Sequence, residues 1–139
     1  MNNAAFFDTN VLIYATLRPD GRSDSARTLL AQGGVVSVQV LNEFANVARR
    51  KLRRSWPEIT RSLASIRALC ADPLPITIET HEAALVLVAR TGYQLYDALI
   101  IASALEADCT MLFTEDLHDG QIIEHRLTIR NPFGEPGRR

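Results

Sequence analysis

The sequence predicts an α/β fold in which helices cover both faces of a parallel sheet. Short apolar runs that are typical of strands alternate along the chain with longer segments whose apolar residues recur at helical spacing. This alternation is the pattern of strand–helix–strand units, which form parallel sheets with helices on each face. Residues 97–107 add to the prediction, because they are apolar on nearly every side, as a helix enclosed within a domain would be.

The first half of the chain alternates strand and helix signals. Residues 4–7 (AAFF) predict a buried strand, and a short helix follows over residues 10–17. Residues 22–31 carry their apolar side chains on one face and stop at a Gly-Gly pair, a common signal for the end of a helix. The β-branched run at residues 35–38 predicts a second strand. Apolar spacing over residues 39–53 predicts a third helix.

The second half begins with a capping box, in which Ser55 caps a helix and Glu58 lies three residues later. Pro57, between them, is favoured in the first turn of a helix. Gly92 marks the end of a later helix. The remaining expected elements are a short strand over residues 76–78, helices over 80–90 and 97–107, and strands over 110–114 and 126–130.

The bulk properties predict one domain. The chain has 139 residues, enough for a substantial core, and we expect residues 1–133 to form the domain and residues 134–139 (GEPGRR) a loose tail. No apolar run approaches a membrane span, and no basic stretch leads into an apolar core as in a secretory signal. The two cysteines lie in unrelated contexts. We therefore expect a cytoplasmic protein with free thiols and no membrane association.

Charge is segregated along the chain. The formal net charge of −1 does not by itself indicate a nucleic-acid-binding protein. However, seven of the 15 Lys and Arg residues lie within residues 49–67, and seven of the 16 Asp and Glu residues lie within residues 97–124. Such a chain can carry a basic patch and an acidic pocket while it is nearly neutral overall.

Four carboxylates border apolar elements. Asp8 ends the first strand, and Glu43 lies on the inward edge of its helix. Asp97 precedes the most apolar helix, and Asp116 follows the strand at residues 110–114 by two residues. Ligand sites in parallel sheets form beyond the carboxyl ends of the strands, so we expect one crevice to collect all four.

Carboxylates that share a crevice repel one another, and their pKa values rise unless a cation is present. Mg²⁺ suits such a site best, because it binds a few carboxylates, keeps several waters and accepts phosphate oxygens. A bound ion of this kind can lower the pKa of a water and hold a phosphodiester during in-line attack.

Each acid also has a simpler interpretation. Asp97 can cap a helix, and Asp8 with Thr9 can form an Asx turn or a cap. Glu43 faces solvent if its helix is rotated slightly, and Asp116 can belong to an ordinary acidic loop. The conjunction of four acids at four rim positions favours a shared site.

Four segments resemble PIN-domain ribonucleases, and most closely the VapC-like toxins of type II toxin–antitoxin modules. The likeness runs from about residue 5 to residue 133 in the order and spacing of that family. It implies a three-layer α/β/α sandwich with a central parallel sheet of four or five strands, and cleavage of RNA that depends on Mg²⁺ or Mn²⁺. The segments are FFDTNVLIYA, SVQVLNEFANV, YDALIIASALEADCTMLFTEDLHDGQ and LTIRNPF.

The resemblance also implies the functional residues and partners. It makes Asp8, Asp97 and Asp116 metal ligands, with Asp8 and Asp97 the firmest, and it makes Glu43 the residue that orients metal or water. It implies a homodimer and an antitoxin that wraps the toxin and blocks its site, for which an arginine entering the acidic pocket is electrostatically sensible. Small polar residues that match supporting positions are Thr9, Asn10, Ser37 and Thr114.

The basic run RRKLRR at residues 49–54 offers a site for RNA phosphates. The alternative is a solvated basic helix end, favoured by the helix dipole. Trp56 nearby can stack on a base or pack as a hydrophobic staple at a helix entry. The candidate RNA-binding residues are Arg49, Arg50, Lys51, Arg53 and Arg54.

Two other functions compete with RNA cleavage. In an aspartate-nucleophile phosphoryl-transfer enzyme, Asp8 would carry a phosphate; that chemistry usually has a second Asp two residues later, where Asn10 stands, and a Lys near a later strand, which the second half lacks. A non-catalytic, receiver-like scaffold with a structural metal would bind the ion without turnover.

Overall fold

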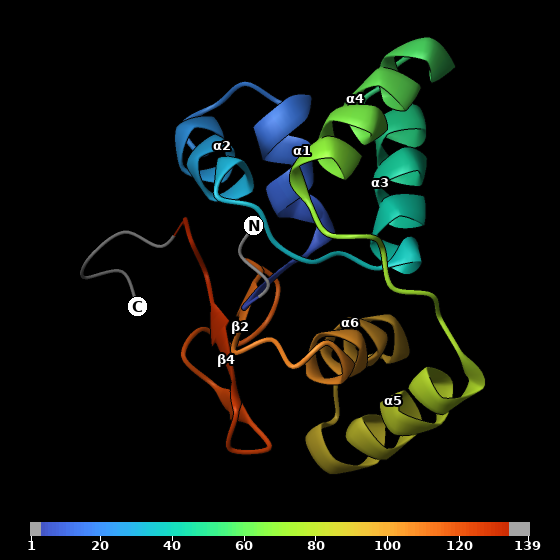
Figure 1. Ribbon diagram of the computed structural model, residues 1–139, viewed down its shortest axis with the longest axis vertical. Coiled ribbons are helices and arrows are strands. Elements are labelled where there is room, and N and C mark those ends of the chain that lie inside the picture. The colour runs from blue at the N-terminus through green and yellow to red at the C-terminus, as the bar shows by residue number, and fades with distance from the viewer. Residues whose placement is uncertain (1–3, 134–139) are drawn as a thin grey trace.

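The computed structural model describes residues 4–133, and the predicted tail at residues 134–139 lies outside this range. The helices form two groups (Figure 1): α1–α4 pack on one another in the upper part of the view, α5 packs on α6 in the lower part, and the sheet lies next to both groups. The elements are β1 (Ala5–Phe7), α1 (Thr9–Thr16), α2 (Ser23–Ala31), α3 (Val38–Arg50), α4 (Trp56–Leu69), α5 (Ile78–Thr91), α6 (Leu95–Glu106), β2 (Met111–Phe113), β3 (Ile122–Ile123) and β4 (Leu127–Arg130).

The sheet confirms the predicted α/β fold class. Its strand order is β1-β2-β4-β3, and β1 pairs with β2, and β2 with β4, in parallel. Phe6 is in register with Leu112, and Leu112 with Ile129, and all three are fully buried. The apolar strand runs therefore form the middle layer of the molecule.

The edge strand β3 departs from the predicted all-parallel sheet, because it pairs antiparallel with β4. A three-residue connection joins them, and its first two residues, Glu124 (φ 50°) and His125 (φ 60°), both adopt the left-handed conformation. The Arg126 N–H donates to the Ile123 carbonyl across the turn at 3.1 Å. Hairpin turns with two consecutive left-handed residues usually carry Asn-Gly or Asp-Gly. Glu124 and His125 stand there instead, so the sequence has no turn signal at this hairpin.

Two predicted strands do not form regular ladders. Val35 and Ser37 make only isolated parallel bridges, to Phe6 and Leu74, because the chain turns directly into α3. The strand expected at residues 76–78 is wrong. Thr77 instead caps α5, and its hydroxyl accepts a hydrogen bond from the Thr80 N–H at 3.1 Å.

The helix boundaries follow local capping chemistry. The predicted capping box of α4 is confirmed, with Ser55 and Glu58 each satisfying a backbone N–H of the other. α6 begins two residues before the predicted position, with Gln94 as its N-cap. Asp97 therefore lies inside the first turn, and its interpretation as a simple cap is wrong. α3 ends at Arg50, earlier than predicted.

The core lies where both helical groups meet the sheet. α6 is buried from Ala98 to Leu105, as its apolar composition predicts. Phe7 at the end of β1 stacks on Phe113 at the end of β2, with ring centroids 6.2 Å apart. Within residues 4–133 no single helix is long and apolar enough to cross a membrane; only α5 and α6 together reach that composition, and they are bent by 116° at their junction.

We predict that Gly34→Ala destabilises the fold by about 1–3 kcal/mol, because overpacking costs this much. A Cβ at Gly34 would lie 2.6 Å from the Phe7 ring and 2.9 Å from the Ala5 carbonyl oxygen. Gly21→Ala is the matched control, since a Cβ there meets nothing within 4 Å. Urea unfolding of the two variants measures the difference, and equal midpoints would contradict the prediction.

Candidate active site

Asp8 is held at the junction of β1 and α1. Its backbone N–H donates to the Phe113 carbonyl at 3.0 Å, which ties the ends of the two central strands together. Its side chain is the N-cap of α1, with Oδ1 accepting from the Thr9 N–H at 2.6 Å. Oδ2 accepts from the Thr114 hydroxyl, also at 2.6 Å. The cap interpretation is thus correct, and the same carboxylate lies at the carboxyl ends of the strands.

Burial governs the protonation of Asp8, which is only 4% exposed. Desolvation raises the pKa of this carboxyl to about 6. The hydrogen bonds from Thr114 and Thr9 pull the pKa down, whereas the nearby charges of Asp116 and Glu43 push it up. A buried carboxylate beside two other acids is an energetically costly arrangement.

Glu43 reaches the site from α3. Its Oε2 accepts from the Thr9 hydroxyl at 2.9 Å, and its Oε1 accepts from the Gln39 side chain at 3.1 Å. Ser37 contributes indirectly, because its buried hydroxyl caps α3 by accepting from the Val40 N–H at 3.3 Å. Ser37 therefore fixes the start of the helix that carries Glu43. Sequence reasoning missed Gln39, although its i−4 spacing from Glu43 is the helical signal for such a contact.

Asp116 comes from the loop after β2. Its Oδ2 accepts from the Asn10 side chain at 3.1 Å, and its backbone N–H donates to the Thr114 hydroxyl at 3.1 Å. The Thr114 hydroxyl thus bonds both Asp8 and the backbone of Asp116. Burial and then the neighbouring Glu115 raise the pKa of Asp116, and the charge of Lys51 lowers it.

Asp97 is half-buried in the first turn of α6. Burial raises its pKa most, followed by the charges of Asp116 and Glu43. Asp8 feels the same two charges. The structure therefore brings all four predicted acids into one electrostatic neighbourhood, from the ends of β1 and β2 and from α3 and α6.

The acids on either side of Asp116 in the sequence are engaged elsewhere. Glu115 accepts from the Tyr14 hydroxyl at 2.8 Å and lies 3.9 Å from the Arg22 guanidinium. Arg22 also donates to the Tyr14 hydroxyl and lies over its ring. Asp119 accepts from the Asn131 N–H at 2.9 Å. The sequence could not separate these roles, because each depends on a partner that lies well away in the chain, at Tyr14 for Glu115 and at Asn131 for Asp119.

The donor set suits a hard divalent cation. Carboxylate oxygens are the ligands that Mg²⁺ and Mn²⁺ prefer. None of the ion pairs formed within residues 4–133 includes any of the four acids, so no arginine or lysine in that range pairs with them directly. In the same range no three His, Cys, Asp or Glu side chains are already arranged around one point as metal ligands. The residues fit the ion by charge and chemistry.

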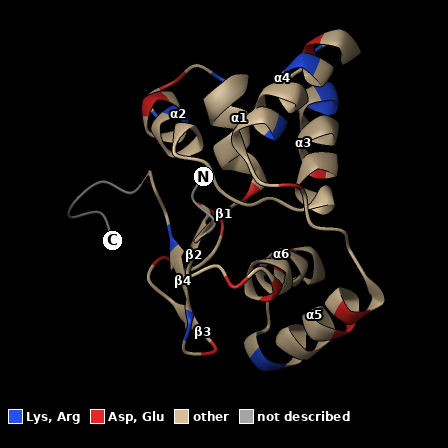
Figure 2. Ribbon diagram, viewed as in Figure 1, with Lys and Arg blue, Asp and Glu red and all other residues tan. Residues whose placement is uncertain are grey.

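The predicted basic residues lie at the far end of α3 and just beyond it, and Lys and Arg gather there in Figure 2. Arg49 and Arg50 occupy the last turn of α3, and Lys51 is its C-cap. Arg53 lies outside the helix with φ 56°. Arg54 has structural contacts, because it donates to the Leu17 carbonyl at 2.7 Å and forms an ion pair with Glu58.

Residues 5–118 match the family described as PIN domain. The VapC20 toxin of Mycobacterium tuberculosis, a Sarcin-Ricin loop cleaving toxin, matches the structure with a TM-score of 0.66 and 22% identity, over 81% of this chain and 91% of that one. A toxin–antitoxin complex from Klebsiella pneumoniae matches with a TM-score of 0.70 and 21% identity, over 93% of this chain and 98% of that one. Comparison with curated protein sequences finds no match. Since the family match spans most of the chain and includes Asp8, Glu43, Asp97 and Asp116, the chain belongs to the PIN domain family.

Proposed function

We propose that this PIN-domain protein is a divalent-metal-dependent endoribonuclease and the toxin of a toxin–antitoxin pair. The observation that carries the proposal is the buried Asp8, whose pKa is raised by burial and by the neighbouring acids, while no basic residue of the described range 4–133 forms an ion pair with it. The two structural matches support it, because one is a Sarcin-Ricin loop cleaving toxin and the other a toxin–antitoxin complex.

In this proposal Asp8, Asp97 and Asp116 hold Mg²⁺ or Mn²⁺. The ion, when bound, lowers the pKa of a water and offsets charge on the phosphodiester. Thr9 positions two of the acids, because its N–H donates to Asp8 and its hydroxyl donates to Glu43. Glu43 is thereby positioned to orient the attacking water. Asn10 fixes the second oxygen of Asp116 in the same way, so the acids are held in place before substrate arrives.

The remaining partners follow from surface features. The exposed Arg49, Arg50, Lys51 and Arg53 offer positive charge for RNA phosphates. An antitoxin arginine entering the acidic pocket would neutralise it and block cleavage. Exposed Ile78, Leu85 and Val86 give α5 an apolar surface suited to a homodimer. We propose that the protein acts in the cytoplasm.

The direct test is cleavage of single-stranded RNA by the purified protein, with mapping of the new ends. We expect cleavage with Mg²⁺ or Mn²⁺, none with a chelator, and recovery when the ion is restored. Cleavage that continues undiminished in the chelator, or metal binding without any cleavage of RNA, would contradict the proposal. The second outcome would instead support a metal-binding scaffold.

The adjacent acids Glu115 and Asp116 provide a matched pair of variants. We expect Asp116→Asn to lower cleavage by more than about 100-fold, because it removes a proposed metal ligand and residues that only support a ligand already cost about 10- to 100-fold. Glu115→Gln should leave metal affinity unchanged, because Glu115 is bonded to Tyr14 and Arg22 and not to the pocket. Metal titration and cleavage rates of both variants measure this difference. A larger loss for Glu115→Gln would reverse the assignment.

A further inference from the structure

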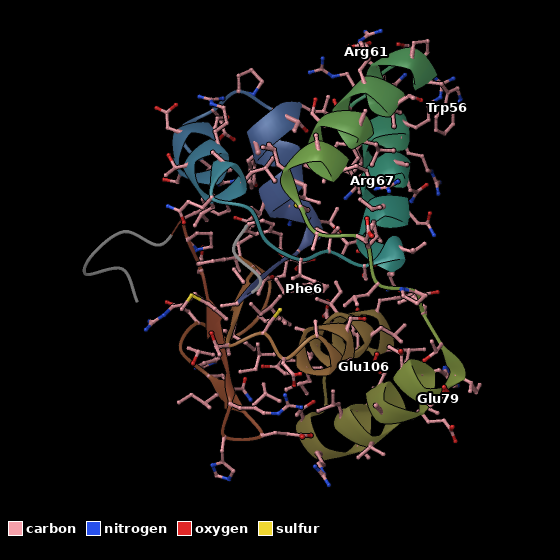
Figure 3. The ribbon with its side chains drawn as sticks, viewed as in Figure 1. Phe6, Trp56, Arg61, Arg67, Glu79 and Glu106 are labelled. Atoms are coloured by element: carbon pink, nitrogen blue, oxygen red, sulfur yellow. The ribbon has the colours of Figure 1, made fainter. Side chains whose placement is uncertain are left out.

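Trp56 is an exposed aromatic side chain at the outer end of the α3–α4 pair. It is the first residue of α4, and its side chain is 55% exposed. Figure 3 shows it pointing away from the body of the protein. The staple interpretation is therefore wrong, because the ring is not packed into the core. Trp56 is also the only tryptophan in the chain.

Arg49 holds the ring in place. Its guanidinium carbon lies 5.3 Å from the centre of the Trp56 ring, within the range of a cation–π contact. The same guanidinium donates to the Arg54 carbonyl at 3.1 Å. Arg49 is thus held by two contacts, one with the Arg54 carbonyl and one with the Trp56 ring.

The surroundings of Trp56 are basic. Arg50, Lys51 and Arg53 are exposed beside it in the chain. The nearby acid, Glu58, is already engaged with Ser55 and Arg54. An aromatic ring interleaved with arginines is the combination that binds single-stranded nucleic acid, because a base stacks on the ring and the phosphates pair with the cations. A protein partner would require further apolar surface around the ring, whereas the side chain that lies over the ring here, Arg49, is charged.

The helix α3 carries both Glu43, in the acidic pocket, and Arg49, beside Trp56. Arg49 and Glu43 are six residues apart, which corresponds to about 9 Å along the helix axis. The charge of Lys51 is felt by Asp116. A strand whose phosphate lies in the pocket can therefore reach Trp56 within a few nucleotides.

We propose that Trp56 and Arg49 form a stacking site for an unpaired base of the RNA substrate, a few nucleotides from the bond that is cleaved. This inference rests on the proposed function for its substrate and names a subsite of it. The stacked base contributes affinity without strong sequence preference, since every base offers an aromatic face. The contribution to sequence choice would then come from elsewhere in the site.

The test uses tryptophan fluorescence, which reports Trp56 alone. In the Asp8→Asn background with a chelator, so that RNA stays intact, an oligoadenylate of about 12 nucleotides is titrated into the protein. We expect saturable quenching. Inorganic polyphosphate, which supplies charge without bases, should bind without quenching, and duplex RNA should quench less. The Trp56 variants lack this fluorophore, so their affinity is measured by the fluorescence anisotropy of a dye-labelled oligoadenylate, with wild-type Trp56 as the reference. In that assay Trp56→Leu should weaken oligoadenylate binding about 10-fold, whereas Trp56→Phe should keep it within about 3-fold.

Two controls separate stacking from charge and from misfolding. Arg49→Gln and Arg27→Gln remove the same charge, and only the first should weaken binding, since Arg27 lies on α2 and pairs with Asp24. Thermal unfolding of each variant checks the fold. Absence of quenching, or unchanged affinity in Trp56→Leu, would overturn the stacking site even if wild-type protein cleaves RNA. Quenching without metal-dependent cleavage would instead refute the nuclease proposal alone.

Discussion

Asp8→Asn is expected to abolish RNA cleavage and, at the same time, to make the metal-free protein more stable at neutral pH. Loss of a direct metal ligand should cost more than the roughly 10- to 100-fold typical of supporting residues. The stability gain follows from burial, because an ionised Asp8 with a pKa of about 6 is disfavoured in the folded state relative to its ordinary value of 3.8. That cost is on the order of 3 kcal/mol as an upper bound.

The gain should be smaller than this bound. Asparagine retains an oxygen for the Thr9 N–H, but it cannot accept from Thr114 as the second carboxylate oxygen does. Loss of one buried hydrogen bond costs about 1 kcal/mol. We therefore expect Asp8→Asn to stabilise the metal-free protein by about 1–2 kcal/mol at neutral pH.

The stability difference between Asp8→Asn and wild-type protein should depend on pH. The pKa of Asp8 is higher in the folded than in the unfolded state, so between pH 3.8 and about 6 the folded state binds more protons. The contribution of Asp8 to the free energy of unfolding of wild-type protein is therefore greatest at low pH, and this contribution is lost as the pH rises through about 6. The difference between Asp8→Asn and wild type should grow over that window and then level off.

Chemical unfolding across this pH range measures the difference, with a chelator in one series and Mg²⁺ in the other. Mg²⁺ should raise the unfolding midpoint of wild-type protein and leave that of Asp8→Asn almost unchanged. A variant that still cleaves RNA, or that is less stable than wild type at every pH, would show that Asp8 is a structural cap and not part of a metal site.

The four acids could be predicted from the sequence because each borders an apolar element, and parallel strands deliver such positions to one edge of the sheet. The partners of Glu115 could not, since Tyr14 lies 101 residues away and side-chain contacts at that separation leave no local pattern. The hairpin at β3 was missed for a related reason. Glu124 and His125 adopt left-handed backbone conformations without glycine or asparagine, and tertiary packing outweighs their local preference.

The Thr114 hydroxyl links Asp8 to Asp116 within the candidate site. Thr114→Val is therefore the second variant with a large expected effect. Thr114 is fully buried, donates to Asp8 Oδ2 and accepts from the Asp116 N–H. Valine has nearly the same shape but satisfies neither group. We expect cleavage and Mg²⁺ affinity to fall about 10- to 100-fold, and stability to fall by about 1–3 kcal/mol.

Thr114→Ser and Thr80→Val separate function from packing. Serine keeps the hydroxyl and should restore most of the Mg²⁺ affinity. Thr80 is equally buried, and its hydroxyl donates to Glu106 at 2.9 Å, outside the acidic cluster. Thr80→Val should therefore destabilise the protein to a similar degree while leaving metal affinity unchanged. Removing the Thr114 hydrogen bond also raises the pKa of Asp8 further, because that bond lowers it, so Mg²⁺ binding by Thr114→Val should require a higher pH than in wild type. If Thr80→Val and Thr114→Val lose Mg²⁺ affinity equally, the hydroxyl has only a structural role.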